Sequence, residues 1–277
     1  MSPEPTDLIA ALSERARSGK LSLPVLPTVA VEMLASVDDE RVDARSLAEK
    51  IQRDPSLAAH VLRVSNSARF APKEPIVSLT QAIGRLGLAT LREIVVTVAV
   101  KGSVFKVKGH EAYVEKLWKH ALLSGRLAQE IARARRANVE AAFLCGLLHD
   151  IGAPVALQGL VDLCKETGFC LIERAMLHTI AGLHQEIGAA LVETWKLADW
   201  VQSVVRFHHQ PEQATKHQEL VRTTALADVL AYWFEEDEGE GLPPGIEHAA
   251  ALDLYDDDLE ALVARGTKLA KETAKNS

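Results

Sequence analysis

The chain has 277 residues, of which 48% are hydrophobic and 25% charged, and its formal net charge is −7. This composition is typical of a globular protein built as one large domain or two small ones. The acidic balance and the lack of a basic stretch argue against direct binding to nucleic acid. No apolar run reaches the ~18 residues that a membrane helix needs, and the N-terminus lacks a secretory pattern, so we expect a cytoplasmic protein.

Start and stop signals divide the first hundred residues into short helices. Asp7 is the expected N-cap of the first helix. Asp54 followed by Pro55 is a strong start signal, because Asp accepts hydrogen bonds from the free amides and Pro fits the first helical position. The segment 88–105 is rich in β-branched residues, which favours a strand, but its length and helical surroundings favour a helix. The helices predicted here span 7–17, 28–37, 43–53, 55–67, 76–86 and 88–105.

Longer apolar patterns follow in the second part of the chain. The segment 111–136 has the longest helical periodicity, and 139–150 is nearly all apolar, which predicts a buried central helix. Acidic residues at 235–240 and 253–258 then interrupt the pattern, and we interpret them as solvated surface. No segment alternates with a period of two for long enough to demand a sheet, so the sequence predicts an all-α fold. The remaining helices are predicted at 161–168, 171–178, 184–197, 200–209, 219–234 and 259–273.

A set of histidines and aspartates points to a metal centre. His149 and Asp150 end the apolar central helix, where both side chains can turn toward one site. His120 lies in the middle of the long helix near the core, and Asp228 lies in an apolar helix where an unpaired carboxylate would be costly. Imidazole nitrogens with carboxylate oxygens suit a divalent ion such as Fe, Mn, Ni or Zn. Each of these residues, taken alone, could equally be a structural or surface residue.

The order of these residues, H…HD…D, resembles the pattern of the HD superfamily of metal-dependent phosphohydrolases. His184, His208 and His209 extend the series so that it resembles the two-metal arrangement of HD-GYP phosphodiesterases. In such a site two cations clamp the phosphate oxygens and activate a water molecule, and the resemblance implies that Asp150 bridges the metals. The predicted site therefore holds one or two divalent ions, with His120, His149, Asp150, His184, His208, His209 and Asp228 as ligands.

Motifs in the first half distinguish between subfamilies. The strings LPVLP at 23–27, IQRDPSL at 51–57, LRVSNS at 62–67 and SLTQAIG at 78–84 resemble the N-terminal half of HDOD domains. GLLHDIG at 146–152, HQEIG at 184–188 and HHQP at 208–211 continue the likeness, which covers roughly 21–234. The resemblance implies a multi-helix HD-type core with an N-terminal helical subdomain. The expected parts are an N-terminal helix and tail (1–20), the N-terminal helical half (21–105), the HD-like core (106–234), and an acidic linker with a C-terminal helix (235–277).

The resemblance implies a role in bacterial signal transduction, often without catalysis. With no receiver, GGDEF or EAL segment in the sequence, we expect a stand-alone module that binds a signalling protein or a nucleotide-like ligand such as a cyclic dinucleotide. Ala153 replaces the lysine that catalytic HD-GYP enzymes carry after HDIG, Gln210 replaces their Glu after HH, and no GYP motif occurs. Metal-dependent phosphodiester hydrolysis is the alternative function, and a metal kept only for structure is a third.

Overall fold

A computed structural model describes residues 5–35, 44–67, 70, 73–168, 172–236 and 243–275. Every regular element within these ranges is a helix, and the all-α prediction is confirmed. Parts of the predicted helices at 28–37, 43–53 and 171–178, and most of the acidic segment 235–240, lie outside the described residues. The chain divides into two compact units, one formed by 25–103 and the other by 1–24 together with 104–277. Each unit is described by itself.

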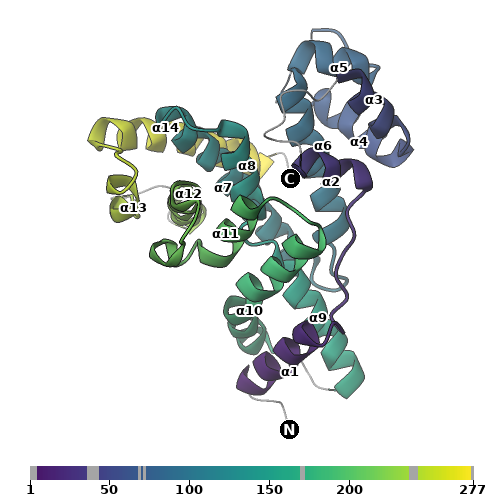
Figure 1. The fold of residues 1–277 in the computed structure, drawn as a ribbon, viewed down its shortest axis with the longest axis vertical. Helices are drawn as coiled ribbons and strands as arrows, with labels where there is room; N and C mark the ends of the chain where they lie inside the picture. Colours follow the sequence, from purple (N-terminus) through teal and green to yellow (C-terminus); the bar gives the residue numbers. More distant parts are fainter. Residues whose placement is uncertain are drawn as a thin grey trace. The chain divides into compact units, whose positions relative to one another are not determined.

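Unit 25–103 contains short helices, and the start of one of them, α4, matches the predicted capping signal. Its elements are α2 (Thr28–Ala35), α3 (Ala44–Gln52), α4 (Pro55–Ser65), α5 (Leu79–Leu86) and nearly all of α6 (Leu88–Val104) (Figure 1). Asp54 accepts a hydrogen bond from the Leu57 amide at 3.0 Å. Asn66 ties the end of α4 to the following loop, because its side chain both donates to and accepts from the backbone of Ile76 at 2.8 Å.

The β-branched segment at the end of this unit is a helix, as predicted. The side chains of Ile94, Val95 and Val96 are at most 3% exposed in α6. The preference of β-branched residues for strands reflects how well their side chains fit a half-buried pleated surface. In this unit, a helix buries the same side chains, and the free energy of that burial outweighs the strand preference. Tertiary packing therefore determines the conformation of this segment.

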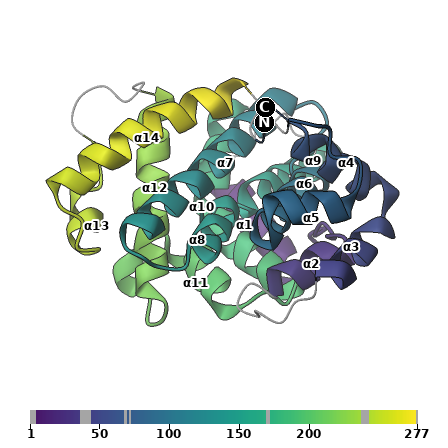
Figure 2. The same ribbon diagram turned by 90° about the horizontal axis from the view of Figure 1, so that it is seen from above.

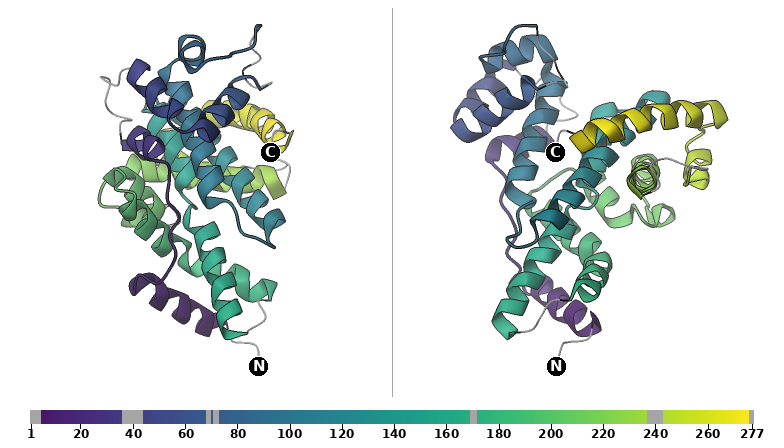
Figure 3. Two further views of the ribbon diagram at one scale, coloured as in Figure 1. Left: turned by 90° about the vertical axis from the view of Figure 1, so that its right-hand side faces the viewer. Right: turned by 180° about the vertical axis from the view of Figure 1, so that it is seen from behind.

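The second unit contains the elements that carry most of the predicted site residues. They are α1 (Pro5–Arg17), α7 (Glu111–Ala134), α8 (Val139–Leu148), α9 (Gly152–Thr167), α10 (Glu173–Thr194), α11 (Asp199–Phe207), the 3-10 turn η1 (Pro211–Gln213), α12 (Gln218–Glu236), α13 (Ile246–Ala250) and α14 (Asp256–Lys275). Helix α1 packs on α9 and α10 (Figure 3), and Arg15 forms an ion pair with Glu166 of α9 at 2.5 Å. The N-terminal segment is thus part of this unit.

Three local predictions were wrong. Helix α10 is continuous where two helices, 171–178 and 184–197, were expected, because Gly182 in the predicted gap is tolerated inside a packed helix. Helix α9 starts at Gly152, nine residues earlier than 161, and its first turns are buried. Helix α1 starts at Pro5, so Asp7 lies in its first turn and is not the N-cap.

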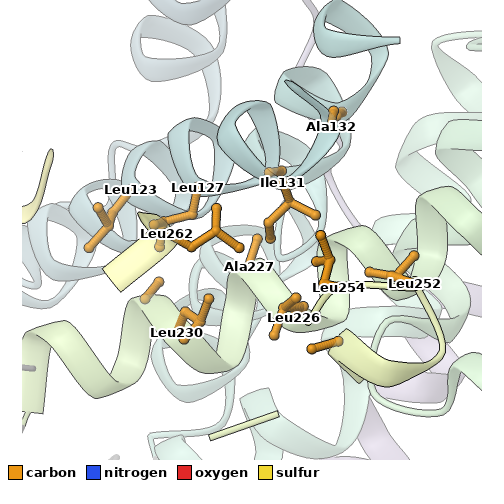
Figure 4. Close-up of a cluster of buried hydrophobic side chains, with 14 of the residues drawn as sticks. Leu123, Leu127, Ile131, Ala132, Leu226, Ala227, Leu230, Leu252, Leu254 and Leu262 are labelled. Atoms are coloured by element: carbon orange, nitrogen blue, oxygen red, sulfur yellow. The ribbon is translucent and has the colours of Figure 1, made fainter. Parts of the chain in front are cut away.

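One hydrophobic cluster of this unit's core lies between α7, α12 and α14. Leu127, Ile131, Leu226 and Leu230 are at most 1% exposed and pack together with Leu262 of the C-terminal helix (Figure 4). Helix α14 runs beside α7 (Figure 2). Each fully buried leucine contributes roughly 1.5–3 kcal/mol relative to an exposed one. The C-terminal helix is therefore an integral part of the core that supports α7 and α12.

Residues 139–167 are long and apolar enough to cross a membrane, a feature that the sequence analysis did not expect. In the fold, however, 83% of the most apolar window of this stretch is buried. It is also divided into α8 and α9 by residues 149–151. A central core helix meets the same criterion of length and hydropathy, so the observation is weak evidence for a membrane span.

Glycines allow close helix approach around the end of α8. A methyl group on Gly146 would lie 2.6 Å from the carbonyl oxygen of Ser124 on α7. A methyl group on Gly152 would overlap the carbonyl oxygen of His184 and lie 2.5 Å from the amide nitrogen of Gly188, both on α10. Backbone atoms cannot move aside as a flexible side chain can. These two positions therefore set how closely α8 and α9 approach their neighbours.

We expect Gly152→Ala to destabilise the protein by about 3 kcal/mol, because the added methyl group must push α9 and α10 apart. Gly182→Ala is the matched control on α10, since its new methyl group would meet only Ile9 at an ordinary 3.5 Å. That change should raise stability by about 0.5–1 kcal/mol through helix propensity. Urea unfolding of both variants measures the two effects, and equal stabilities would contradict the proposed backbone contact.

Candidate metal centre

The site begins where α8 ends. The helix is apolar and buried from Ala141 to Leu148, and its C-cap residue His149 lies in the core with no solvent exposure. The Nδ1 atom of His149 lies 2.8 Å from the carbonyl oxygen of Gly146. A carbonyl oxygen only accepts hydrogen bonds, so Nδ1 carries the proton and donates it. In the neutral ring Nε2 is then a free lone pair, and it faces Asp150.

Two further histidines are held in the same way by their own helices. His184 of α10 donates from Nδ1 to the carbonyl oxygen of Ala181 at 3.0 Å, and His208 after α11 donates to that of Val204 at 3.1 Å. Both side chains are buried. Backbone carbonyls thus fix the tautomer and the orientation of each ring, which is the usual outer contact of a metal-ligating histidine.

These imidazoles converge on one carboxylate. The Oδ1 atom of Asp150 lies 3.2 Å from Nε2 of His208 and 3.4 Å from Nε2 of His184, and its Oδ2 lies 3.5 Å from Nε2 of His149. The three Nε2 atoms and Oδ1 are buried, and none has a hydrogen-bond partner. Two atoms bonded to one ion at about 2.1 Å lie roughly 3.0–3.4 Å apart. The arrangement therefore fits one or two divalent cations, which would satisfy these atoms between them.

A second carboxylate, Asp228 of α12, faces the other side of His149. Its Oδ1 atom accepts a hydrogen bond from Nε2 of His120 at 2.9 Å and lies 3.5 Å from Nε2 of His149. Its Oδ2 atom lies 3.8 Å from Nδ1 of His209. The side chain of His209 is 45% exposed, whereas that of Asp228 is 4% exposed. The centre is thus buried around His120 and opens to solvent at His209.

The structure brings all seven predicted site residues into one cluster. Their donor atoms form three overlapping groups, and within each group every donor atom lies within 4.8 Å of the others. Asp150, His149 and His208 each belong to two of these groups. Of the three, only the carboxylate of Asp150 has two oxygens with which it could serve two ions. The groups are Asp150 with His184, His208 and His209; His120 with His149 and Asp150; and His149 with His208 and Asp228.

The sequence analysis missed two residues that contact the cluster. Glu235 accepts a hydrogen bond from Nδ1 of His120 at 3.1 Å. The ring of Tyr232 stacks on that of His120 with 4.1 Å between centroids. Both lie on the same helix as Asp228, four and seven residues further along, and this spacing places them on one helical face. That spacing was the available signal, but Glu235 was interpreted as the start of an acidic linker.

Packing within the cluster raises the pKa of some of its groups and lowers the pKa of others. Burial lowers the pKa of His120, but hydrogen bonds to Asp228 and Glu235 outweigh it and raise the value to about 10. Burial raises the pKa of Asp150, but the neighbouring His149 and the other rings hold it well below its usual range. The pKa of His209 falls to about 4 through partial burial and the charge of His208. The cluster thus favours ionised carboxylates beside a cation.

A model of the HDOD domain matches residues 23–211, about two thirds of the chain. The chain belongs to the HDOD family. An uncharacterised protein of Treponema pallidum is 28% identical over 233 residues, which make up 81% of this chain and 44% of that protein. The chain therefore spans less than half the length of that relative. The HDOD match ends before α12, so Asp228, Tyr232 and Glu235 lie outside the matched residues.

Solved structures show the same fold. A candidate metal-dependent phosphohydrolase from Shewanella amazonensis SB2B has a TM-score of 0.72 and 19% identity, with 97% of this chain and 98% of that chain covered. A candidate signal transduction protein from Marinobacter aquaeolei VT8 has a TM-score of 0.73 and 22% identity, with 98% and 63% covered. At this level of identity the likeness establishes a shared fold and nothing more.

In metal-free protein, stability should fall between pH 6.5 and pH 4 partly through His209. The unfolded chain binds a proton there with a pKa near 6.5 and the folded chain with one of about 4, so stability rises with pH across this window. His209→Ala should reduce the change in the free energy of unfolding between pH 6.5 and pH 4 by about 1 kcal/mol or less. The effect is small because solvent partly screens this side chain. Urea unfolding in chelator at several pH values measures this, with exposed His178→Ala as the control. An unchanged slope in the His209 variant would contradict the assignment.

Proposed function

We propose that this chain is a regulatory HDOD domain of a bacterial signalling pathway, and that its histidine and aspartate cluster binds one or two divalent metal ions. The observation that carries the metal-binding part is the convergence of three buried Nε2 atoms on the Asp150 carboxylate without hydrogen bonds. Leaving these four buried groups unpaired would cost several kcal/mol in total, whereas one or two bound cations would satisfy them.

The ligand types in the cluster limit the metals that it could bind to a few. Imidazole nitrogens with carboxylates suit Fe, Mn, Ni and Zn, and the chain contributes no thiolate to the groups described above. We propose that the bound ions stabilise the arrangement of α7, α8, α10, α11 and α12 and shape a surface for a signalling protein or a nucleotide-like ligand. We further propose that the domain acts in the cytoplasm, away from the membrane and without direct contact to nucleic acid.

We expect protein purified without a histidine tag or chelator to contain one to two equivalents of Fe, Mn, Ni or Zn by elemental analysis. His149→Ala should lose most of this metal, because it removes a ligand atom shared by two of the donor groups. His178→Ala removes an exposed histidine on α10 and should retain it. Absence of metal from all three proteins, before and after incubation with these ions, would refute the proposal.

A metal-dependent phosphohydrolase is the second candidate, and one observation favours it. The side chains of Asp150 and His209 are 14% and 45% exposed, so the cluster has an edge that a substrate can reach. Divalent ions bound there would polarise a phosphate oxygen and lower the pKa of a coordinated water. Against this function, Ala153 is 3% exposed and supplies neither charge nor a hydrogen bond where the resemblance implies a phosphate-binding lysine.

We expect the metal-loaded protein to hydrolyse bis(p-nitrophenyl) phosphate no faster than the His149→Ala variant, because no cation at position 153 assists the phosphate. Steady-state assays with Mn²⁺, Fe²⁺ and Ni²⁺ test this under identical conditions. Sustained turnover that disappears in both His149→Ala and Asp150→Asn would replace the regulatory proposal with the enzymatic one.

A further inference from the structure

Helix α12 encloses the ring of His120 with three side chains from one face. Asp228, Tyr232 and Glu235 are spaced by four and three residues, so they project from the same side of the helix. Asp228 contacts Nε2 of His120 at 2.9 Å and Glu235 contacts Nδ1 at 3.1 Å, while the ring of Tyr232 stacks on the imidazole. Of the rings in the cluster, His120 thus has carboxylates at both nitrogens.

The contact between Glu235 and Nδ1 of His120 distinguishes this ring from the other buried histidines of the cluster. His149, His184 and His208 each donate from Nδ1 to a backbone carbonyl of their own helix. A carboxylate is a stronger acceptor than a carbonyl, so it holds the Nδ1 proton more firmly and makes Nε2 a more basic ligand. The contact joins residues 115 positions apart in sequence, so it forms only when α12 is docked on α7.

We infer that Glu235 is a positioning residue of the candidate metal centre, which holds His120 with Nδ1 protonated and Nε2 directed at the ion position beside Asp228 and His149. This inference rests on the proposed metal binding and deepens it. On metal binding the proton between Nε2 and Asp228 leaves to solvent, while the proton between Nδ1 and Glu235 stays. Loss of Glu235 would let the ring exchange tautomers and turn its lone pair away.

The same contact makes the two ion positions unequal. The position at His120 is surrounded by Asp150, Asp228 and the imidazole backed by Glu235, and the side chains of His120, His149 and Asp228 are at most 4% exposed. The position at His184, His208 and His209 shares Asp150 but opens to solvent at His209. More negative charge in a less hydrated site binds a divalent cation more tightly. The ion at His120 is therefore the tighter of the two.

The test is a Co²⁺ titration of the metal-free full chain in the presence of a competing chelator, followed by visible absorption. We expect Glu235→Ala to weaken the tighter equivalent by roughly 10–100-fold and to leave the weaker one unchanged. Glu235→Gln should lose less, because its amide oxygen still accepts the Nδ1 proton. Glu236→Gln changes the exposed neighbour on α12 and should match the wild type. His209→Ala should show the converse pattern and lose the weaker equivalent.

The outcomes separate the two proposals. If the wild type takes up no Co²⁺, metal binding fails and the role of Glu235 fails with it. If the wild type binds Co²⁺ and Glu235→Ala binds it equally tightly with the same spectrum, only the role of Glu235 is refuted. A purely structural role would weaken both equivalents alike in Glu235→Ala and would not be rescued by Glu235→Gln, and that result also overturns the inference. Circular dichroism of each variant confirms that it is folded.

Discussion

The buried carboxylate of Asp150 and the lone pairs aimed at it set the main constraint on the HDOD fold of this chain. Acceptor atoms repel one another at 3.2–3.5 Å unless a proton or a metal ion lies between them. Keeping them together requires helices whose positions do not relax when the repulsion acts. The close packing around this cluster is therefore as much a part of the site as the ligands themselves.

The helical unit meets this constraint with two devices. For His149, His184 and His208, a backbone carbonyl of the histidine's own helix locks the ring, as Gly146 does for His149, so ring orientation follows from helix position. Glycines then allow the helices to approach until backbone meets backbone, with Gly152 of α9 against α10. On the other side, the leucine core shared by α7, α12 and α14 holds Asp228 and Glu235 against His120.

This construction is compatible with a regulatory domain as well as with an enzyme. A cluster that binds cations rigidly couples five helices through a few short contacts, so occupancy of the site changes the stability of the whole unit. Catalysis needs more, namely an open position on the metal and a partner for the phosphate charge. The exposed edge at His209 would let a substrate reach an ion held there, while the buried methyl group of Ala153 leaves the second requirement unmet at that position.

Local sequence patterns determined much of the HDOD fold. Apolar periodicity predicted α7, α8 and α12, and the Asp54-Pro55 pair marked the start of α4. The resemblance to the HD and HD-GYP patterns named the seven site residues that lie together. The first two features depend only on residues a few positions apart. They did not reveal that α10 is continuous or that α14 belongs to the core.

Only the tertiary structure decided the distances and the outer contacts of the cluster. The hydrogen bonds of His120 join residues 108 and 115 positions apart, and no local pattern specifies whether such groups meet. The sequence analysis assigned Glu235 to a solvated acidic run, because runs of charged residues usually face water. Docking of α12 on α7 turned Glu235 inward. Where a side chain serves a site only through packing between distant helices, its role follows from the fold and not from its sequence neighbours.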